Sequence, residues 1–166
     1  MKGTMKELDQ ALREQLVTAL EGGNAHATFD EVVDKFPAHL RGQKAGLPYS
    51  AWQLVEHIRI AQEDILQFSD NREGKYKPKK WPEAYWPKES APPSESAWER
   101  SIAAIQRDRD AMIALIRDAR SDLAEPFSWG DGQNLIREAI LIVDHNANHI
   151  GELLTLRRLL GIWPPH

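Results

Sequence analysis

Two histidines four residues apart are the side chains of this sequence whose spacing best suits chemistry. His145 and His149 lie in the segment DHNANHIGELLTLRRLLG, residues 144–161, which otherwise has the composition of a buried helix. Residues i and i+4 of a helix share one face, so both imidazoles can reach one metal ion at about 2.0–2.1 Å. The same pair could instead form hydrogen bonds in a core, or supply half of an acid–base site.

A third histidine, His57, lies in another helical segment, beside Leu54 and Ile58 at the edge of an apolar stripe. It can point into a helical bundle, although a boundary histidine can also extend toward solvent. Three histidines from two packed helices would leave coordination positions open, as a catalytic metal requires. Spacing alone leaves the metal site and the two other interpretations open.

Four segments with helical periodicity must position these side chains. They predict amphipathic helices over about residues 5–21, 50–69, 94–118 and 133–160. The first segment has one apolar stripe, formed by Met5, Leu8, Leu12, Leu16 and Leu20. The second segment begins with Ser50 and Gln53 at the spacing of a capping box, and Ser94 or Ser96 is the expected N-cap of the third.

These segments predict an all-α four-helix bundle with two long connections, in a single domain over residues 1–166. The length suits one domain, and no strand alternation, hairpin turn or internal repeat is visible. Residues 22–49 and 70–93 are long for bundle connections, and a short helix near 28–35 should interrupt the first. Long loops are common places for binding walls.

Composition and missing motifs exclude several classes of function. A net charge of −4 predicts no nucleic-acid partner, and the absence of cysteine excludes disulfides, thiolate zinc sites and a cysteine nucleophile. The charged N-terminus and short apolar runs predict no signal peptide and no membrane partner, hence a cytoplasmic protein. The motifs of phosphate-binding loops, serine hydrolases and di-iron bundles do not occur.

Two motifs together resemble the DinB-like family of four-helix-bundle proteins. They are LPYSAWQLVEHIRIAQEDIL and DHNANHIGELLTLRRLLG, and the loop WPEAYWP and the turn GDGQ between them also fit. The resemblance extends over about residues 5–163. Members commonly bind nickel or zinc through three histidines, which by motif position are His57, His145 and His149. The resemblance therefore implies one Zn²⁺ or Ni²⁺ ion as cofactor.

The resemblance also implies a class of reaction. Related branches include transferases and isomerases that use low-molecular-weight thiols, and many members are dimers. We therefore expect a metal-dependent hydrolase or thiol-dependent transferase that acts on a small molecule and forms a homodimer. The alternative is a non-catalytic dimeric protein in which the metal only stabilises the bundle. The family name refers to damage inducibility and does not imply DNA repair.

Glu152 is the candidate for proton transfer. The residues between the paired histidines are Asn-Ala-Asn, so the glutamate base of the HExxH zinc proteases is missing. Glu152 follows His149 by three residues and could orient its imidazole or act as a base. It could equally form an ion pair with Arg157 or Arg158.

Other polar residues have weaker claims on the site. Gln53 could line it, but we expect the capping box to occupy that side chain. Residues 75–87 combine lysines and aromatics with prolines, and we expect a wall or lid near the metal, with plain packing as the alternative. His26 and His39, in the first long connection, could approach the metal, whereas His166 is terminal and has no expected role.

Overall fold

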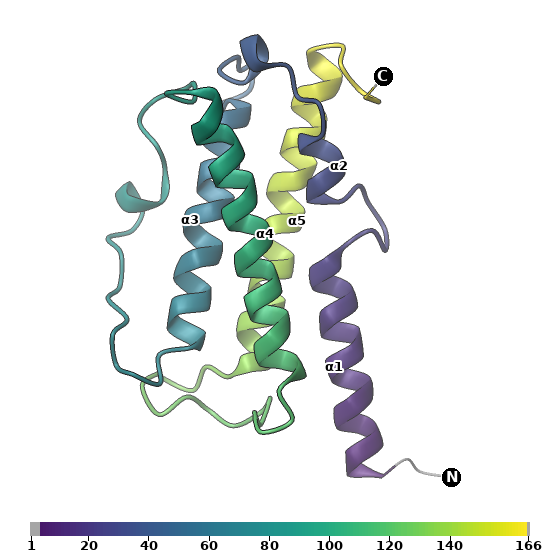
Figure 1. The fold of residues 1–166 in the computed structure, drawn as a ribbon, viewed down its shortest axis with the longest axis vertical. Helices are drawn as coiled ribbons and strands as arrows, with labels where there is room; N and C mark the ends of the chain where they lie inside the picture. Colours follow the sequence, from purple (N-terminus) through teal and green to yellow (C-terminus); the bar gives the residue numbers. More distant parts are fainter. Residues whose placement is uncertain (1–3, 166) are drawn as a thin grey trace.

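Residues 4–165 are described by a computed structural model, and this part of the chain is all-helical, without strands. Its helices are α1 (Met5–Glu21), α2 (Phe29–Val33), α3 (Ala51–Ser69), α4 (Glu95–Arg117) and α5 (Leu135–Leu159), with short 3-10 helices η1 (Ala38–Leu40) and η2 (Glu83–Tyr85). Figure 1 shows the four long helices side by side, which confirms the predicted helical bundle. His166 lies outside the described residues.

Capping side chains explain where the long helices begin. The residue before each of these helices accepts a hydrogen bond from the backbone N–H three positions later, and these caps are Thr4, Ser50, Ser94 and Asn134. Each such cap typically contributes about 1 kcal/mol. The predicted box of Ser50 and Gln53 forms both of its hydrogen bonds. Ser94, rather than Ser96, is the cap of α4.

The apolar stripe of α1 is buried only toward its C-terminal end. Leu16 and Leu20 are buried, whereas Met5 is 82% exposed and Leu8 is 64% exposed. Figure 1 shows the reason, because the first turns of α1 extend beyond the end of α4. The apolar stripe that the sequence predicts is therefore covered only over the later turns of this helix.

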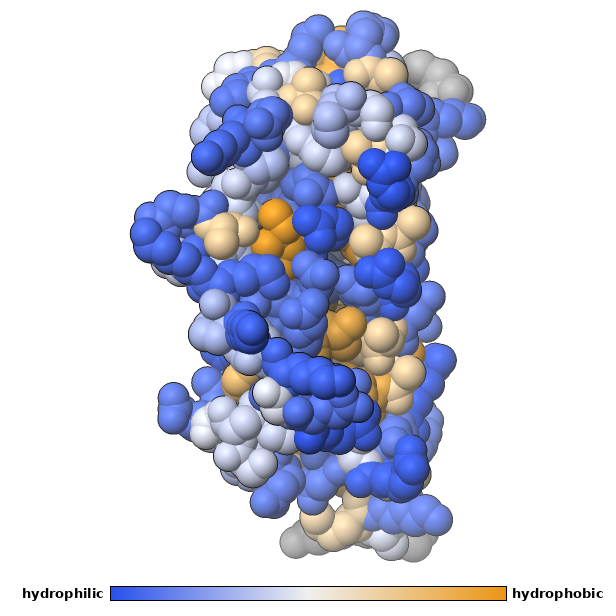
Figure 2. Space-filling model, turned by 60° about the vertical axis from the view of Figure 1, so that its left-hand side comes forward, coloured by the Kyte–Doolittle hydropathy of each residue, from blue (hydrophilic) through white to orange (hydrophobic). Residues whose placement is uncertain are grey.

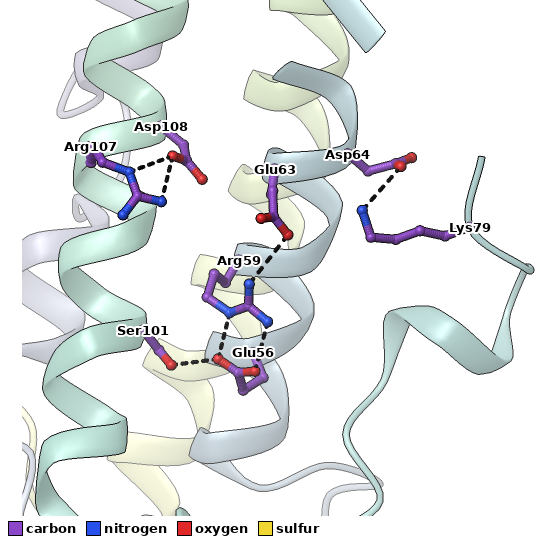
Figure 3. A network of polar contacts seen from close by, with 8 residues as sticks. All are labelled: Glu56, Arg59, Glu63, Asp64, Lys79, Ser101, Arg107 and Asp108. Carbon is purple, nitrogen blue, oxygen red and sulfur yellow. Dashed lines mark hydrogen bonds and ion pairs between the residues drawn. The ribbon is translucent and has the colours of Figure 1, made fainter. Parts of the chain in front are cut away.

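α3 forms the centre of the packing. It packs most extensively against α4 and α5, and α1 covers the other side of these two helices. Polar side chains also line two sides of α3, one that faces α4 and one that faces the 70–93 connection (Figure 3). Glu56 accepts hydrogen bonds from Arg59 and from Ser101 of α4, so it is turned away from the histidines.

The two long connections follow different helices for most of their length and meet near the start of α3, where Tyr49 stacks on Trp86. Residues 22–49 carry α2 and η1, and residues 70–93 run along the outside of α3 and carry η2 (Figure 1). The side with the 70–93 connection shows separate apolar patches in a mainly hydrophilic surface (Figure 2). Within the described residues, no helix combines the length and apolarity needed to cross a membrane.

Candidate metal centre

The three predicted histidines meet on the seam between α3 and α5. His57 comes from α3, and His145 and His149 come from successive turns of α5. One ring nitrogen of each lies within 4.8 Å of the corresponding atoms of the other two. Nε2 of His57 and Nε2 of His145 lie 3.0 Å apart. Residues far apart in sequence therefore form one cluster of nitrogen donors.

An oxygen atom lies against the outer nitrogen, Nδ1, of each imidazole. These contacts join His57 to the Tyr85 carbonyl at 2.8 Å, His149 to Glu152 Oε2 at 2.6 Å, and His145 to Asn146 Oδ1 at 3.3 Å. Carbonyl and carboxylate oxygens only accept hydrogen bonds, so each Nδ1 must be the donor. This tautomer leaves the Nε2 lone pair free, as in histidines that bind metals through that atom.

The donor set fits a divalent cation. With both Nδ1 atoms protonated, the Nε2 atoms of His57 and His145 face each other at 3.0 Å with unshared electron pairs. Such a contact is repulsive unless a positive charge lies beside it. Nitrogens that share one ion at about 2.0–2.1 Å each are separated by about 3.0–3.4 Å. The observed separation therefore suits joint coordination.

Burial keeps these imidazoles in the neutral form that binds metal. His57 is only 2% exposed. Its burial lowers its pKa from 6.5 to about 4, although the Tyr85 carbonyl acts in the opposite direction, and the neighbouring imidazoles lower the pKa further. Burial also lowers the pKa of His145. At neutral pH a metal ion therefore competes with few bound protons for these two ligands.

Aromatic rings of the connections cover one side of the centre. Trp86 stacks on the His57 ring, with centroids 3.8 Å apart and planes 6° apart. Tyr49 stacks on the other side of Trp86, with centroids 3.9 Å apart. The structure thus places part of the 75–87 segment against a predicted metal ligand. This wall excludes water from one face of His57.

A pocket of about 400 Å³ reaches the centre through Glu152, and none of the three histidines is part of its lining. Its walls include apolar residues on one side and polar residues of α5 on the other, among them Leu47, Tyr49, Leu54, Asn148, Glu152 and Thr155. Glu152 belongs both to this pocket and to the hydrogen bond that holds His149. Its side chain is 38% exposed, so the carboxylate lies at the boundary between the centre and solvent.

The remaining candidates lie elsewhere. Gln53 forms the capping box with Ser50, and its amide nitrogen lies 3.5 Å from the Pro87 carbonyl. Neither His26 nor His39 is part of the histidine cluster, and both are exposed. Arg157 is buried against carbonyls of Val32 and Asp34, so it is not the partner of Glu152.

Sequence reasoning missed the acceptors of two imidazoles. Tyr85 holds His57 through its backbone carbonyl, and side-chain types carry no signal for such a contact. Asn146 directly follows His145, at the position of the glutamate base in HExxH proteases, and its side-chain oxygen faces the imidazole. Its amide nitrogen donates to Gln62 at 2.8 Å, and Gln62 in turn donates to the Ile105 carbonyl of α4 at 2.6 Å. The sequence carries one signal for this acceptor, because an asparagine next to a candidate ligand can hydrogen-bond its imidazole.

Comparison with known proteins gives one match. The family model described as the DinB superfamily matches residues 7–153, which include the three histidines and Glu152. No curated protein and no solved structure matches the chain.

Proposed function

The chain belongs to the DinB superfamily, and from this premise we propose that it is a divalent-metal-dependent enzyme, a hydrolase or a thiol-dependent transferase. His57, His145 and His149 are its proposed metal ligands. The observation that supports this most strongly is the set of acceptors on the three Nδ1 atoms, because it leaves the Nε2 lone pairs free in a cluster whose ring nitrogens lie within 4.8 Å of one another. Histidines that serve only as core hydrogen-bonding groups have no need for this convergence.

The proposed cofactor is one Zn²⁺ or Ni²⁺ ion, since imidazole suits both metals. Such an ion would supply a Lewis acid that activates water or a thiol. Three neutral ligands leave its positive charge uncompensated, which favours an anionic nucleophile. The histidine cluster of the described residues contains no carboxylate and no fourth histidine, so protein ligands leave part of the coordination shell for substrate.

Glu152 is the proposed proton-transfer residue. Its Oε2 accepts the hydrogen bond of His149 Nδ1, and its second oxygen can accept a proton from a nucleophile in the adjoining pocket. A carboxylate in this position both fixes a ligand and lies within the proposed substrate site. These two functions are separable by substitution, because glutamine keeps an acceptor oxygen but is not a base.

The proposed substrate is a small molecule with an apolar part. Leu47, Tyr49 and Leu54 offer an apolar surface, and Glu152 is the charged side chain of the pocket lining. Among the described residues, no lysine, arginine or histidine belongs to that lining, which does not favour a phosphorylated substrate. Because the chain has no cysteine, any thiol nucleophile must come from a low-molecular-weight thiol.

Turnover with defined metal content tests the proposal. Metal-free protein should be reloaded with Zn²⁺ or Ni²⁺ and assayed with ester substrates, and with small thiols plus an electrophilic acceptor. We expect turnover that depends on the added metal and is abolished in His149→Ala. Glu152→Gln should retain metal but lose most of the rate. Turnover that survives both chelation and His149→Ala would contradict the proposal.

A non-catalytic dimeric metal protein is the second candidate. The exposed Met5 and Leu8 offer an apolar helix face for association, which both candidates can use, so stability and turnover separate the two. For the non-catalytic protein, chelation should lower the Tm strongly, while none of the ester or thiol substrates is turned over in any metal form.

A further inference from the structure

We propose that Asp64 and Tyr85 are positioning residues of the histidine centre and couple docking of the 70–93 connection to metal binding. This inference rests on the proposed metal function. Neither residue belongs to the histidine cluster. Their contribution follows instead from how Tyr85 is held at both of its ends.

Tyr85 joins two points of α3. Its backbone carbonyl accepts the hydrogen bond of His57 Nδ1 at 2.8 Å, and its hydroxyl donates to Asp64 Oδ2 at 2.6 Å. His57 and Asp64 lie about two turns apart on α3, so they present side chains to the same side of the helix. The segment η2, which ends at Tyr85, is therefore bound to α3 at two positions, at His57 and about two turns further along the helix at Asp64.

Asp64 collects further contacts from the same connection. It is a buried carboxylate, 8% exposed, and it is 3.4 Å from the Tyr76 hydroxyl and 3.4 Å from Lys79 Nζ. Figure 3 shows Lys79 reaching from the connection to Asp64 on α3. A buried carboxylate is costly without partners, so Asp64 favours the docked position of the connection over an open one.

The docked connection determines the state of His57. The Tyr85 carbonyl fixes the proton on Nδ1, and the next residue, Trp86, covers the ring by stacking. Loss of the phenol–carboxylate bond would free η2 and remove the acceptor that keeps Nε2 directed to the centre. Since coupling between two binding events is reciprocal, metal bound to His57 should in turn hold the connection in place.

Tyr76 provides a matched control within the same connection. Its hydroxyl also reaches Asp64, at 3.4 Å, but its backbone does not hold His57. The variants Tyr85→Phe and Tyr76→Phe each remove one hydroxyl from the same carboxylate. A general effect of disturbing Asp64 should appear in both, whereas a positioning effect should appear in Tyr85→Phe alone.

The first experiment measures the Zn²⁺ affinity of parent, Tyr85→Phe and Tyr76→Phe by competition with a chromophoric chelator. We expect Tyr85→Phe to bind about 10–100-fold more weakly than parent, as for other groups that orient a metal ligand, and Tyr76→Phe to bind as parent does. Asp64→Asn keeps an acceptor oxygen and should recover most of the affinity that Asp64→Ala loses. Equal affinity of Tyr85→Phe and parent would overturn the inference.

The second experiment follows the connection itself by limited trypsin cleavage after Lys79 and Lys80. In parent, Zn²⁺ should slow cleavage, and metal-free Tyr85→Phe should be cut faster than metal-free Tyr76→Phe. If parent binds no metal, the proposed function fails. The metal-free comparison still tests whether the Tyr85–Asp64 hydrogen bond holds the connection on α3. Identical cleavage rates of the two metal-free variants would show that the Tyr85–Asp64 hydrogen bond does not hold the connection on α3.

Discussion

At the scale of single residues, the acceptors of the three imidazoles differ in strength. Glu152 offers a carboxylate at 2.6 Å, whereas Asn146 offers a neutral amide oxygen at 3.3 Å. Hydrogen bonds to a charged acceptor are roughly twice as strong as neutral ones. His149 is therefore held more firmly than His145, and its acceptor is the more informative one to remove.

Removal of Glu152 should weaken metal binding. We expect Glu152→Ala to lower the Zn²⁺ affinity by about 10–100-fold, because His149 loses the acceptor that fixes its ring and tautomer. Competition with a chromophoric chelator measures this change. Glu99→Ala, an exposed glutamate of α4, is the control and should bind as parent does. If both variants keep the parent affinity, Glu152 does not orient His149.

The lowered pKa of His57 predicts a pH-dependent stability of the metal-free protein. His57 has a pKa of about 4 in the fold and 6.5 as its ordinary value, so the unfolded chain binds the proton more readily between these limits. The free energy of unfolding should therefore fall as the pH is lowered from about 6.5 toward 4, by up to about 1.4 kcal/mol per pH unit from this group.

Urea unfolding at pH 7, 6 and 5, in the presence of a chelator, measures that pH dependence. His57→Asn lacks the titrating ring and should show a flatter decline than parent over this range. A decline of equal steepness in both proteins would show that His57 is not the group responsible.

At the scale of helices, local chemistry made most boundaries predictable. Ser50, the N-cap of α3, and Gln53, its partner in the capping box, lie three residues apart. Hydrophobic periodicity marks the apolar face of each helix, so capping and periodicity can both be read from short segments. The register of His145 and His149 follows directly from the helix repeat. These signals place His57 at the edge of an apolar stripe and His145 with His149 on one helix face, whereas the family resemblance, and not spacing, selects the three as ligands.

Other features of the site depend on contacts between distant segments. The path of residues 70–93 across α3 brings the Tyr85 carbonyl to His57 and its hydroxyl to Asp64, and neither contact has a local pattern. The exposure of Met5 and Leu8 likewise follows from the length of α1 relative to its neighbours. Periodicity shows which face of a helix is apolar but not how much of that face is covered.

The caps of α3 and α1 should differ in their contribution to stability. Ser50 is fully buried, caps α3, and its hydroxyl also donates to the Ser90 carbonyl. We expect Ser50→Ala to cost about 1–2 kcal/mol, since it removes the cap and leaves a carbonyl unpaired. Thr4→Ala removes a cap of the same type at the exposed start of α1 and should cost less. Urea unfolding measures the free energy of unfolding of both variants. An equal decrease in the two would contradict the expected difference between the caps.

At the scale of the whole molecule, residues 4–165 form two apolar core clusters. One contains Trp52, Leu54, Ile58, Trp98 and Leu153, and the other contains Leu16, Leu20, Met112, Ile116 and Ile142. Gln62, only 1% exposed, links α3 to α4 and α5 through the Ile105 carbonyl and Asn146. The histidine centre is therefore built on helices tied together by internal hydrogen bonds, as is typical of cofactor sites in bundles.

Metal should stabilise the folded chain as a whole. A ligand that binds only the native state contributes about 2.7 kcal/mol at a concentration of 100 Kd. For a domain of this size we expect a rise in Tm of roughly 5–10 °C. Thermal unfolding with and without Zn²⁺ measures it. His149→Ala should show little of the shift, and an equal shift in that variant would place the stabilising metal elsewhere.

The exposed start of α1 predicts self-association. We propose that the homodimer implied by the family resemblance covers Met5 and Leu8, the exposed large apolar side chains of this helix, with a second copy of the chain. Light scattering should then give the mass of a dimer for parent and of a monomer for the double variant Met5→Glu/Leu8→Glu. A monomeric parent, or a dimer unchanged by the substitutions, would contradict this assignment.

Metal content is the most direct test of the three-histidine centre. Purified parent, saturated with Zn²⁺ or Ni²⁺ and freed of excess ion, should carry close to one metal ion per chain by elemental analysis. His145→Ala should lose most of that metal while its circular dichroism spectrum remains helical, since the other two imidazoles cannot hold the ion alone. Full metal occupancy in His145→Ala would contradict the three-histidine centre.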